Sequence, residues 1–195
     1  MSQPHPQPAP RSALQQRVTS AILEAAAEEL AARGAQASMA DVSRAAGVAR
    51  ATVYRYFPSR QVLLDELAQV ALQGAEARLT AAAIEDVPLR EGVARAVRAL
   101  VDVGPSFVVL ARERAGSDAA DFDRCVSTPL RRLVERGQSN GDVRADVASS
   151  WLAEALVGLV VSVPQARPAR GRDDTIAAIA SLYLDGAGPR AAASR

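Results

Sequence analysis

Side chains that can bind a nucleic acid are concentrated between residues 50 and 60. Three of them are arginines (Arg50, Arg55 and Arg60), and a threonine and two tyrosines stand between them. A guanidinium group can bond O6 and N7 of guanine together, and hydroxyl groups can bond phosphate oxygens. Residues 34–60 carry four arginines against one aspartate, although the formal net charge of the whole chain is only +1. This local positive charge predicts a surface for a nucleic acid.

A short helix is predicted just before these side chains. Ser38 can cap its start, because its hydroxyl can accept a backbone N–H of the first turn, and Asp41 can reach back to the cap. Met39 and Val42 share one inward face. Gly47 ends the helix in a left-handed conformation that costs little only for glycine.

A second short helix follows the glycine turn. Val53 and Phe57 are four residues apart and are expected to face the core, which leaves the arginines, the threonine and the tyrosines on other faces. Pro58 stops this helix, and Ser59 can cap the next one, which begins at Arg60. Two short helices joined by a glycine turn, the second with exposed polar side chains, indicate a helix-turn-helix motif.

The motif closely resembles the DNA-binding domain of the Tet-repressor (TetR) family of transcriptional regulators. The resemblance rests on the run AGVARATVYRYFPSR, with SMADVSRA before it and QVLL after it. It covers residues 15–70 in detail and continues beyond them only as a pattern of helices. It implies an all-α fold, in which an N-terminal three-helix helix-turn-helix domain is followed by a C-terminal helical domain for ligand binding and dimerisation. Leu30 stands where family members often carry a phenylalanine.

DNA contacts are assigned from the motif. Arg50 and Arg55 are candidate base readers, and Ala51 or the methyl group of Thr52 could meet a thymine methyl. The remaining polar residues of the motif are expected to bind phosphates, and one of the two tyrosines could instead pack in the core. The complete set of predicted DNA contacts is Ser38, Arg50, Ala51, Thr52, Tyr54, Arg55, Tyr56 and Arg60.

Four segments are expected along the chain. They are a disordered tail at 1–13, the DNA-binding domain at 14–59, the effector-binding and dimerisation domain at 60–186, and a tail at 187–195. Helices are predicted at 14–33, 60–83, 89–103, 107–115, 119–136, 147–163 and 175–184. Ser106 and Asp146 are expected to cap two of these helices. Pro129 is expected to kink one of them or to split it in two.

The last two predicted helices are too apolar to leave much of their surface in water. In the family, the corresponding pair from each subunit forms a four-helix bundle across a two-fold axis. The resemblance therefore implies a homodimer that reads a pseudo-palindromic operator, although the same helices could also be core within one subunit. The predicted interface residues are Trp151, Ala155, Leu159, Ile176, Ile179 and Tyr183.

The middle helices are expected to enclose a cavity for a small effector. Buried charge and histidine are scarce there, which favours an apolar ligand. Each residue that could line this cavity is, taken alone, more typical of a hydrophobic core than of a ligand contact. The candidate lining residues are Val97, Val101, Phe107, Leu110, Phe122 and Val126.

The composition argues against several other classes of protein. His5 is the only histidine and Cys125 the only cysteine, which disfavours metal clusters, catalytic Ser–His or Cys–His pairs and disulfides. We therefore expect no enzyme activity, no metal, no cofactor and a cytoplasmic location. A ligand-released repressor is the main prediction. The alternative is a helical protein-interaction module that does not bind DNA specifically.

Overall fold

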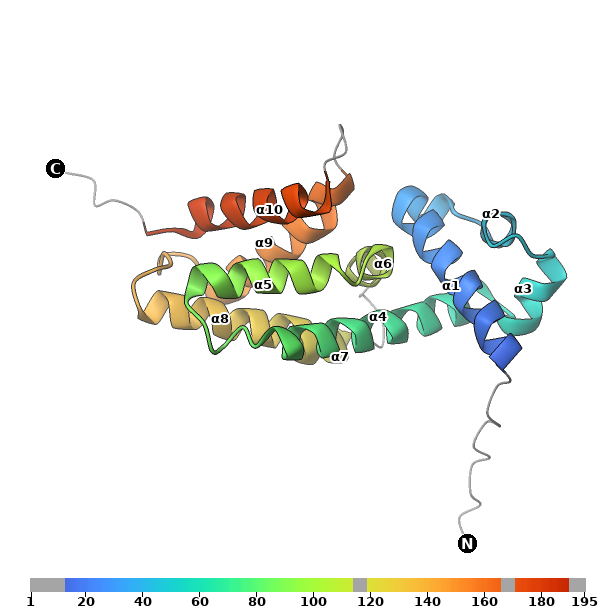
Figure 1. Ribbon diagram of the computed structural model, residues 1–195, viewed down its shortest axis with the longest axis horizontal. Helices are drawn as coiled ribbons and strands as arrows, with labels where there is room; N and C mark the ends of the chain where they lie inside the picture. Colours follow the sequence, from blue (N-terminus) through green and yellow to red (C-terminus); the bar gives the residue numbers. More distant parts are fainter. Residues whose placement is uncertain (1–12, 114–118, 166–170, 190–195) are drawn as a thin grey trace, which may run out of the picture. The chain divides into compact units, whose positions relative to one another are not determined.

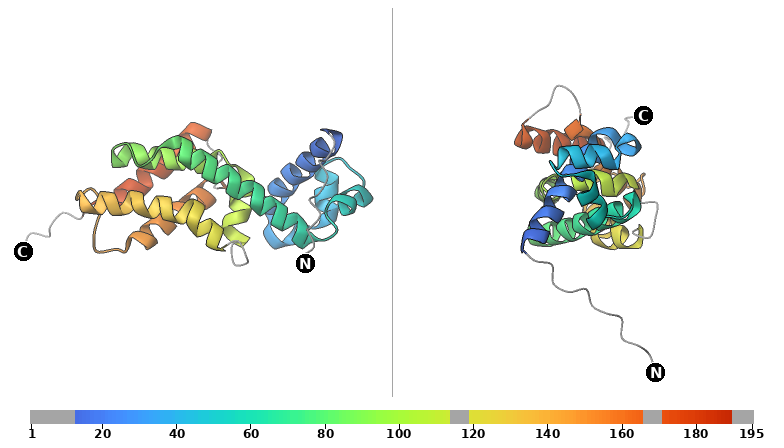
Figure 2. Two further views of the ribbon diagram at one scale, coloured as in Figure 1. Left: turned by 90° about the horizontal axis from the view of Figure 1, so that it is seen from below. Right: turned by 90° about the vertical axis from the view of Figure 1, so that its right-hand side faces the viewer.

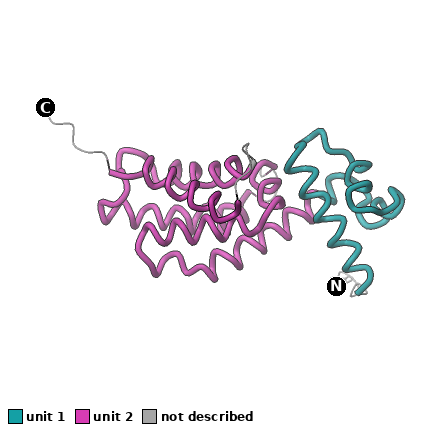
Figure 3. The backbone as a smooth tube through the Cα atoms, turned by 45° about the horizontal axis from the view of Figure 1, so that its top comes forward, with its two compact units in different colours: residues 1–63 teal, residues 64–195 magenta. Residues whose placement is uncertain are grey.

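The computed structural model describes residues 13–113, 119–165 and 171–189, and every regular element in these ranges is helical. The prediction of an all-α fold is confirmed. The chain divides into two compact units, residues 1–63 and 64–195 (Figure 3). The boundary falls inside one continuous helix, α4 (Arg60–Ala82), which begins in the first unit and continues into the second.

The N-terminal unit is a small cluster of helices around an apolar centre. Its elements before α4 are α1 (Ala13–Arg33), the 3₁₀ turn η1 (Gly34–Gln36), α2 (Met39–Ala45) and α3 (Arg50–Tyr56) (Figure 1). Helix α2 packs against both α1 and α3. Ile22, Val42 and Val53 bring one almost fully buried side chain from each of these helices into the centre.

Local signals set the ends of the short helices in this unit. The Ser38 hydroxyl accepts the Asp41 N–H at 3.2 Å, and the Asp41 carboxylate accepts the Ser38 N–H at 3.0 Å, which confirms the predicted capping box. Gly47 follows α2 with φ +66°, in the left-handed region that favours glycine. The Ser59 hydroxyl accepts the Val62 N–H at 3.2 Å, which confirms the cap of α4.

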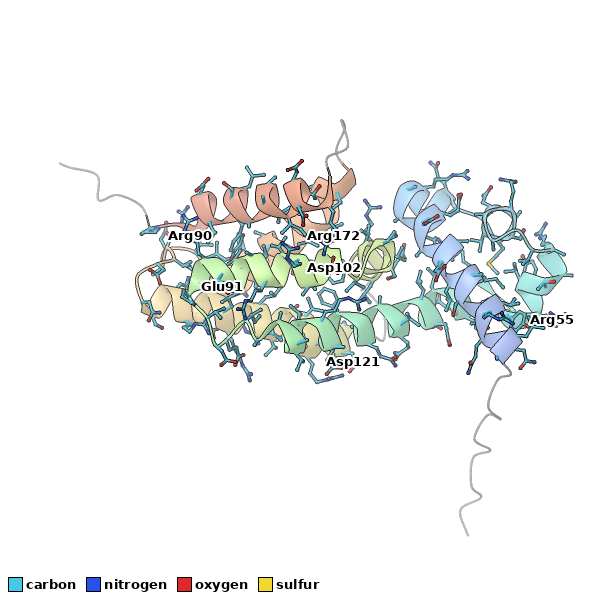
Figure 4. All side chains as sticks on the ribbon, viewed as in Figure 1. Arg55, Arg90, Glu91, Asp102, Asp121 and Arg172 are labelled. Atoms are coloured by element: carbon cyan, nitrogen blue, oxygen red, sulfur yellow. The ribbon has the colours of Figure 1, made fainter. Side chains whose placement is uncertain are left out.

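The C-terminal unit is a helical bundle built on the rest of α4. Its further elements are α5 (Leu89–Val101), α6 (Pro105–Glu113), α7 (Ala119–Phe122), the π-helical segment η2 (Asp123–Ser127), α8 (Thr128–Ser139), α9 (Ser149–Ser162), the 3₁₀ turn η3 (Val163–Gln165) and α10 (Arg172–Ala187). Helix α5 contacts α8, α9 and α10, so it is the centre of the bundle (Figures 1 and 2). Arg172 at the start of α10 bonds Asp102 at the end of α5 at 2.8 Å (Figure 4).

The predicted helix that contains a proline is divided as expected. Helix α7 ends at Phe122, a π-helical segment occupies 123–127, and α8 begins at Thr128 with Pro129 in its first turn. A proline lacks the N–H that a continuous α-helix would need at that point, whereas the first turn of a new helix does not need it. The gap between the helices predicted at 107–115 and 119–136 lies outside the described residues.

Two predicted caps are wrong. Helix α6 already begins at Pro105, so Ser106 lies inside it, and its hydroxyl donates to the Val103 carbonyl at 3.1 Å. Asp146 does not cap α9, whose cap position is Ala148. Its carboxylate instead forms a two-point ion pair with Arg144, with both N–O distances at 2.7 Å. In both cases a nearer partner uses the side chain that the sequence pattern assigned to a helix start.

Distant arginines hold the end of α4. The Arg95 guanidinium donates to the Ala82 carbonyl at 3.1 Å, and that of Arg136 donates to the carbonyls of Ile84 at 3.0 Å and Val87 at 2.9 Å. Between these carbonyls Ala83 has φ +46°, a left-handed conformation that is costly for a residue with a Cβ. The end of α4 therefore depends on contacts made by side chains from α5 and α8.

Candidate DNA-binding surface and effector pocket

Helix α3 turns its apolar side chains inward and its polar side chains outward. Val53 and Phe57 are almost fully buried, as predicted. Arg50, Ala51 and Arg55 are exposed on the other faces (Figure 4 labels Arg55). The helix is thus held by a few core contacts and presents its remaining surface outward.

Each of the two tyrosines of α3 has an arginine guanidinium over the face of its ring. The Arg50 guanidinium lies 5.5 Å from the ring centre of Tyr54 and also donates to its hydroxyl at 3.4 Å. The Arg55 guanidinium lies 5.1 Å from the ring centre of Tyr56. Neither tyrosine is buried, since Tyr54 is 38% exposed and Tyr56 is half-buried, so the alternative of a core tyrosine is wrong. The rings limit the conformations of both arginines and keep them on the outer surface.

The remaining predicted DNA contacts differ in their burial and in the hydrogen bonds that they already make. Thr52 is half-buried on α3, and Arg60 is half-buried at the start of α4 with one terminal guanidinium nitrogen out of solvent and without a hydrogen-bond partner. Ser38 is exposed, but its hydroxyl already donates to the Asp41 carboxylate at 2.6 Å and accepts its N–H. Any DNA contact by Ser38 would therefore compete with the cap of α2.

Two charged partners of the motif were not found from the sequence. Arg33 at the end of α1 and Arg44 on α2 lie 3.2 and 3.0 Å from the same oxygen of Asp41. Hydrogen bonds from the Ser38 hydroxyl and backbone, together with the two arginines, hold the pKa of Asp41 well below its usual range. The spacing of Asp41 and Arg44 on one helix could have revealed the second pair, whereas Arg33 comes close only after folding.

The predicted effector-lining residues pack as core. Val97, Phe107, Leu110, Phe122 and Val126 are almost fully buried in the main apolar cluster of the C-terminal unit, and Val101 packs partly buried against it. The rings of Phe107 and Phe122 stack, with 6.3 Å between their centres and 22° between their planes.

A pocket of about 340 Å³ lies elsewhere in the C-terminal unit, at the end of α4. Its walls come from α4, the loop after it, η2 and the first turn of α8. The lining residues are Glu76, Leu79, Thr80, Ala83, Ile84, Glu85, Asp86, Arg124, Cys125 and Pro129. The periodicity of α4 could not reveal this pocket, because three of its ten lining residues, Arg124, Cys125 and Pro129, come from η2 and α8, far along the chain from α4.

Charged groups surround a buried thiol in this pocket. Arg124 lies 3.0 Å from a carboxylate oxygen of Glu76 and 2.9 Å from one of Asp121 (labelled in Figure 4). Burial, and then the negative charge of Glu76, raise the pKa of the Cys125 thiol. The thiol is therefore protonated and unreactive near neutral pH.

The predicted interface residues fall into two groups. Trp151 is 76% exposed, Ala155 is exposed and Leu159 is half-buried, so these three form one outward stripe on α9. The other three, Ile176, Ile179 and Tyr183, are almost fully buried within the subunit, where α10 packs against α5 and α9. On α10 the large exposed apolar side chain is Leu182, at 57%.

Two features are absent from the residues that the structure describes. In these ranges no helix is long and apolar enough to cross a membrane. The same ranges contain no group of three or more histidine, cysteine or acidic side chains placed to hold a metal ion.

The helix-turn-helix motif is similar in sequence to known proteins. Residues 22–67 match the model of a family described as "Bacterial regulatory proteins, tetR family". The HTH-type transcriptional repressor LfrR of Mycolicibacterium smegmatis is 36% identical over 98 residues, which are 50% of this chain and 51% of LfrR. The sequence match thus spans about half the length of that relative.

Solved structures extend the similarity to both units. The crystal structure of LfrR from Mycobacterium smegmatis in complex with proflavine superimposes with a TM-score of 0.70 at 26% identity, over 89% of this chain and 97% of that one. AibR in complex with isovaleryl coenzyme A and operator DNA gives a TM-score of 0.65 over 88% of this chain and 98% of that one. At 20% identity, AibR shows a shared fold alone.

A capped helix-turn-helix with an outward-facing second helix, joined by α4 to an all-helical unit, defines a helix-turn-helix transcriptional regulator. The family match and the similar structures make the class more specific. Residues 22–67 thus match the TetR family of transcriptional regulators, and the chain shares its fold with the TetR-like regulator LfrR.

Proposed function

We propose that this regulator is a homodimeric repressor that binds a pseudo-palindromic operator and is released by a small molecule. The observation that carries the proposal is the outer face of α3, where Arg50 and Arg55 stand exposed on a helix whose inner side chains are buried in the core. The second helix of such a motif enters the major groove by its N-terminal residues, while neighbouring groups hold the backbone.

Each side chain has a proposed role at the DNA. Arg50 and Arg55 read base edges, because a guanidinium recognises guanine with two hydrogen bonds. Ala51 and the Thr52 methyl group meet thymine methyls. Hydroxyl groups and a further guanidinium set the register on the phosphates; these phosphate ligands are Ser38, Thr52, Tyr54, Tyr56 and Arg60. A regulator with these contacts works where the bacterial chromosome is, in the cytoplasm.

Relatives support control of DNA binding by a ligand. LfrR is described as a repressor, and its structure contains proflavine. AibR was solved together with both isovaleryl coenzyme A and operator DNA. For this chain we infer an effector with an apolar body, since the C-terminal unit supplies mainly apolar side chains. It changes DNA affinity only through its different affinity for two conformations, and we infer that it favours a spacing of the two recognition helices that no longer matches the major grooves.

The proposed dimer uses the outward stripe of α9. Trp151, Ala155 and Leu159 supply it, and Leu182 of α10 takes the place of the three buried residues of that helix. A two-fold axis would bring the same patch from each subunit together. Trp151 is the only tryptophan, so its fluorescence would report burial in the dimer. A Trp151→Arg variant that still sediments as a dimer would contradict this interface.

The experiment that tests the function is fluorescence anisotropy on the DNA upstream of the protein's own gene, across a salt series. The double variant Arg50→Ala, Tyr54→Ala should lose at least a hundredfold in affinity, because it removes one base reader and the ring that holds it. Arg90→Ala, which removes one exposed arginine of the C-terminal unit, is the matched control and should bind within twofold of the wild type (Figure 4).

The salt series separates the two candidate functions. Contacts to phosphates release counterions, so the affinity of a true DNA binder falls steeply as salt rises. Absence of binding to any DNA at low salt would overturn the regulator and favour the alternative, a helical interaction module that does not bind DNA specifically. Saturating effector that left the DNA affinity unchanged would overturn the release step alone.

A further inference from the structure

The pocket at the end of α4 has more acidic than basic side chains in its walls. Glu76, Glu85 and Asp86 face a single lining arginine, Arg124. That arginine is already shared between Glu76, at 3.0 Å, and Asp121, at 2.9 Å. Arg132 lies 3.9 Å from Glu85, a distance at which an exposed pair contributes little. The walls therefore keep an excess of negative charge.

Among the residues that the structure describes, one carboxylate in the wall has no partner of opposite charge. Within the part of the chain that the structure describes, Asp86 forms no ion pair, while Glu76 and Glu85 each lie within 4 Å of an arginine. Apolar groups complete the walls: Leu79, Ile84 and Pro129. A ligand that suits this lining has a positive charge on an apolar body, because each part then meets a complementary surface.

Other kinds of ligand fit the pocket less well. An anion would meet three carboxylates. A metal ion needs several oxygen ligands close together, and among the described residues no cluster of three or more acidic, histidine or cysteine side chains could hold one. A purely apolar molecule would fill the volume but would leave the carboxylates without a partner. A volume of about 340 Å³ suits a small organic molecule.

We propose that this pocket is the effector site and that it binds a small organic cation with an apolar body. The proposal rests on the proposed function for its regulatory meaning, and it adds the charge of the ligand and its place. The cation lies against Asp86 and Glu85, and its body lies against the apolar wall. It also competes with Arg124 for Glu76, and so it loosens a link between η2 and α4.

The position of the pocket gives a ligand direct access to α4. Its wall includes Ala83, Ile84 and Glu85, the residues that follow the last turn of this helix. Ala83 is held at φ +46°, and Arg136 binds the carbonyls of Ile84 and Glu85. A ligand that binds one conformation of this loop more tightly changes where α4 ends, and the same helix begins at Arg60 in the N-terminal unit.

The test compares two probes of nearly the same shape but different charge. Methyltriphenylphosphonium is a cation, and triphenylphosphine oxide is neutral. Isothermal titration of the full chain without DNA should give at least tenfold tighter binding for the cation. Equal affinity for the two probes, or no binding of the cation by a protein that binds its operator, would overturn the proposal.

Variants locate the site. Glu76→Gln, Glu85→Gln, Asp86→Asn together should weaken binding of the cation at least tenfold and leave that of the neutral probe within threefold. The matched control neutralises three exposed acids away from the pocket, with the substitutions Glu28→Gln, Asp142→Asn and Asp174→Asn, and should keep wild-type affinity. Equal losses in both triple variants would show a general charge effect and overturn the site.

A single variant covers the case in which the triple variant does not fold. Asp86→Asn removes no ion pair among the described residues, and it should weaken cation binding about threefold to tenfold with an unchanged helical circular dichroism spectrum. Unchanged affinity in this folded variant would overturn the role of Asp86. Cation binding without DNA binding would leave this site standing and remove only the proposed function, so the two failures are distinguishable.

Discussion

The two units of this regulator define their helix ends in different ways. In the N-terminal unit the ends are set by neighbours in the sequence: Ser38 and Asp41 start α2, Gly47 follows it, and Ser59 starts α4. In the C-terminal unit several of them are held by hydrogen bonds from outside the local cap, some of them from residues far along the chain. The difference shows which parts of a helical protein depend on its tertiary structure.

Three contacts illustrate the second kind of helix end. Arg136 binds the carbonyls that follow α4, about fifty residues before it in the chain. The Gln138 side chain donates to the carbonyls of Arg144 and Val147, at 2.9 and 2.8 Å, and so holds the turn between α8 and α9. The backbone N–H of Arg144 donates to the Ala187 carbonyl at the end of α10, at 2.9 Å. None of these partners is a standard capping pattern.

The largest expected effect compares one buried ring in each unit. Phe57→Ala and Phe122→Ala remove side chains that are 1% and 2% exposed, and each should cost about 3–5 kcal/mol. The short N-terminal unit has little stability to lose. Phe57→Ala should therefore abolish operator binding at 25 °C while most of the helical circular dichroism remains.

Phe122→Ala should instead lower the midpoint of thermal unfolding and keep operator binding at 25 °C, because the larger core of the C-terminal unit tolerates the loss. Equal loss of operator binding in the two variants at 25 °C would contradict the idea that the units differ in stability. Anisotropy and circular dichroism on the same samples provide the measurement.

The second effect tests the remote cap of α4. Arg136→Met keeps the apolar stem of the side chain and removes the hydrogen bonds to the carbonyls of Ile84, Glu85 and Val87. Leaving these carbonyls without a donor should lower the free energy of unfolding by about 3 kcal/mol. Arg132→Met is the control, since its side chain is 66% exposed and 3.9 Å from Glu85, and it should change little. Urea unfolding followed by circular dichroism measures both; similar values would contradict the remote cap.

The same difference explains how much could be predicted from the sequence. The caps of α2 and α4 and the buried positions of α3 were predicted correctly, because each depends on residues a few positions apart. Ser106 and Asp146 were predicted to be caps only because serine and aspartate are common cap residues. In the structure α6 begins at Pro105, before Ser106, and the carboxylate of Asp146 is bound by Arg144. A pattern of residue types cannot show which nearby partner takes a hydroxyl or a carboxylate.

The candidate sites show the same limit. An inward position such as Val97 or Ile179 is recognisable from periodicity, but the pattern does not distinguish core from cavity or from a subunit interface. The pocket at the end of α4 joins Glu76 to Arg124, so it exists only when η2 lies against α4. The outward position of the polar residues of α3 could be predicted because one short helix carries them, and their contacts with DNA stay a prediction.

The third effect tests a close approach that no local signal predicts. Gly137 lies within α8, and a Cβ there would be 2.6 Å from a Val143 methyl and 3.0 Å from one of Leu89. Gly137→Ala should therefore cost about 2 kcal/mol through overpacking. Gly158→Ala, in open space on α9, should instead stabilise by about 0.5–1 kcal/mol. Thermal unfolding of both variants tests this, and stabilisation by both would show that the core yields to the added methyl group.

The smallest effect tests the local cap. Ser38→Ala removes the side chain that accepts the Asp41 N–H, and it should cost the N-terminal unit about 1 kcal/mol. Ser38→Thr keeps the hydroxyl and should stay close to the wild type. Urea unfolding at pH 7, followed through operator binding, measures the difference. A loss with threonine equal to that with alanine would assign the effect to packing and not to the cap.

The capping box also predicts a dependence on pH with a definite sign. The folded protein holds the pKa of Asp41 below its unfolded value near 4, so the ionised form is stabilised by folding. This contribution is complete above about pH 5 and is lost as the pH falls towards the folded pKa. The difference in stability between the wild type and Asp41→Asn should therefore be constant from pH 7 to 5 and shrink below pH 4. A difference that stays constant down to pH 3 would mean that the asparagine loses only hydrogen-bond geometry and that the charge of Asp41 contributes nothing to the start of α2.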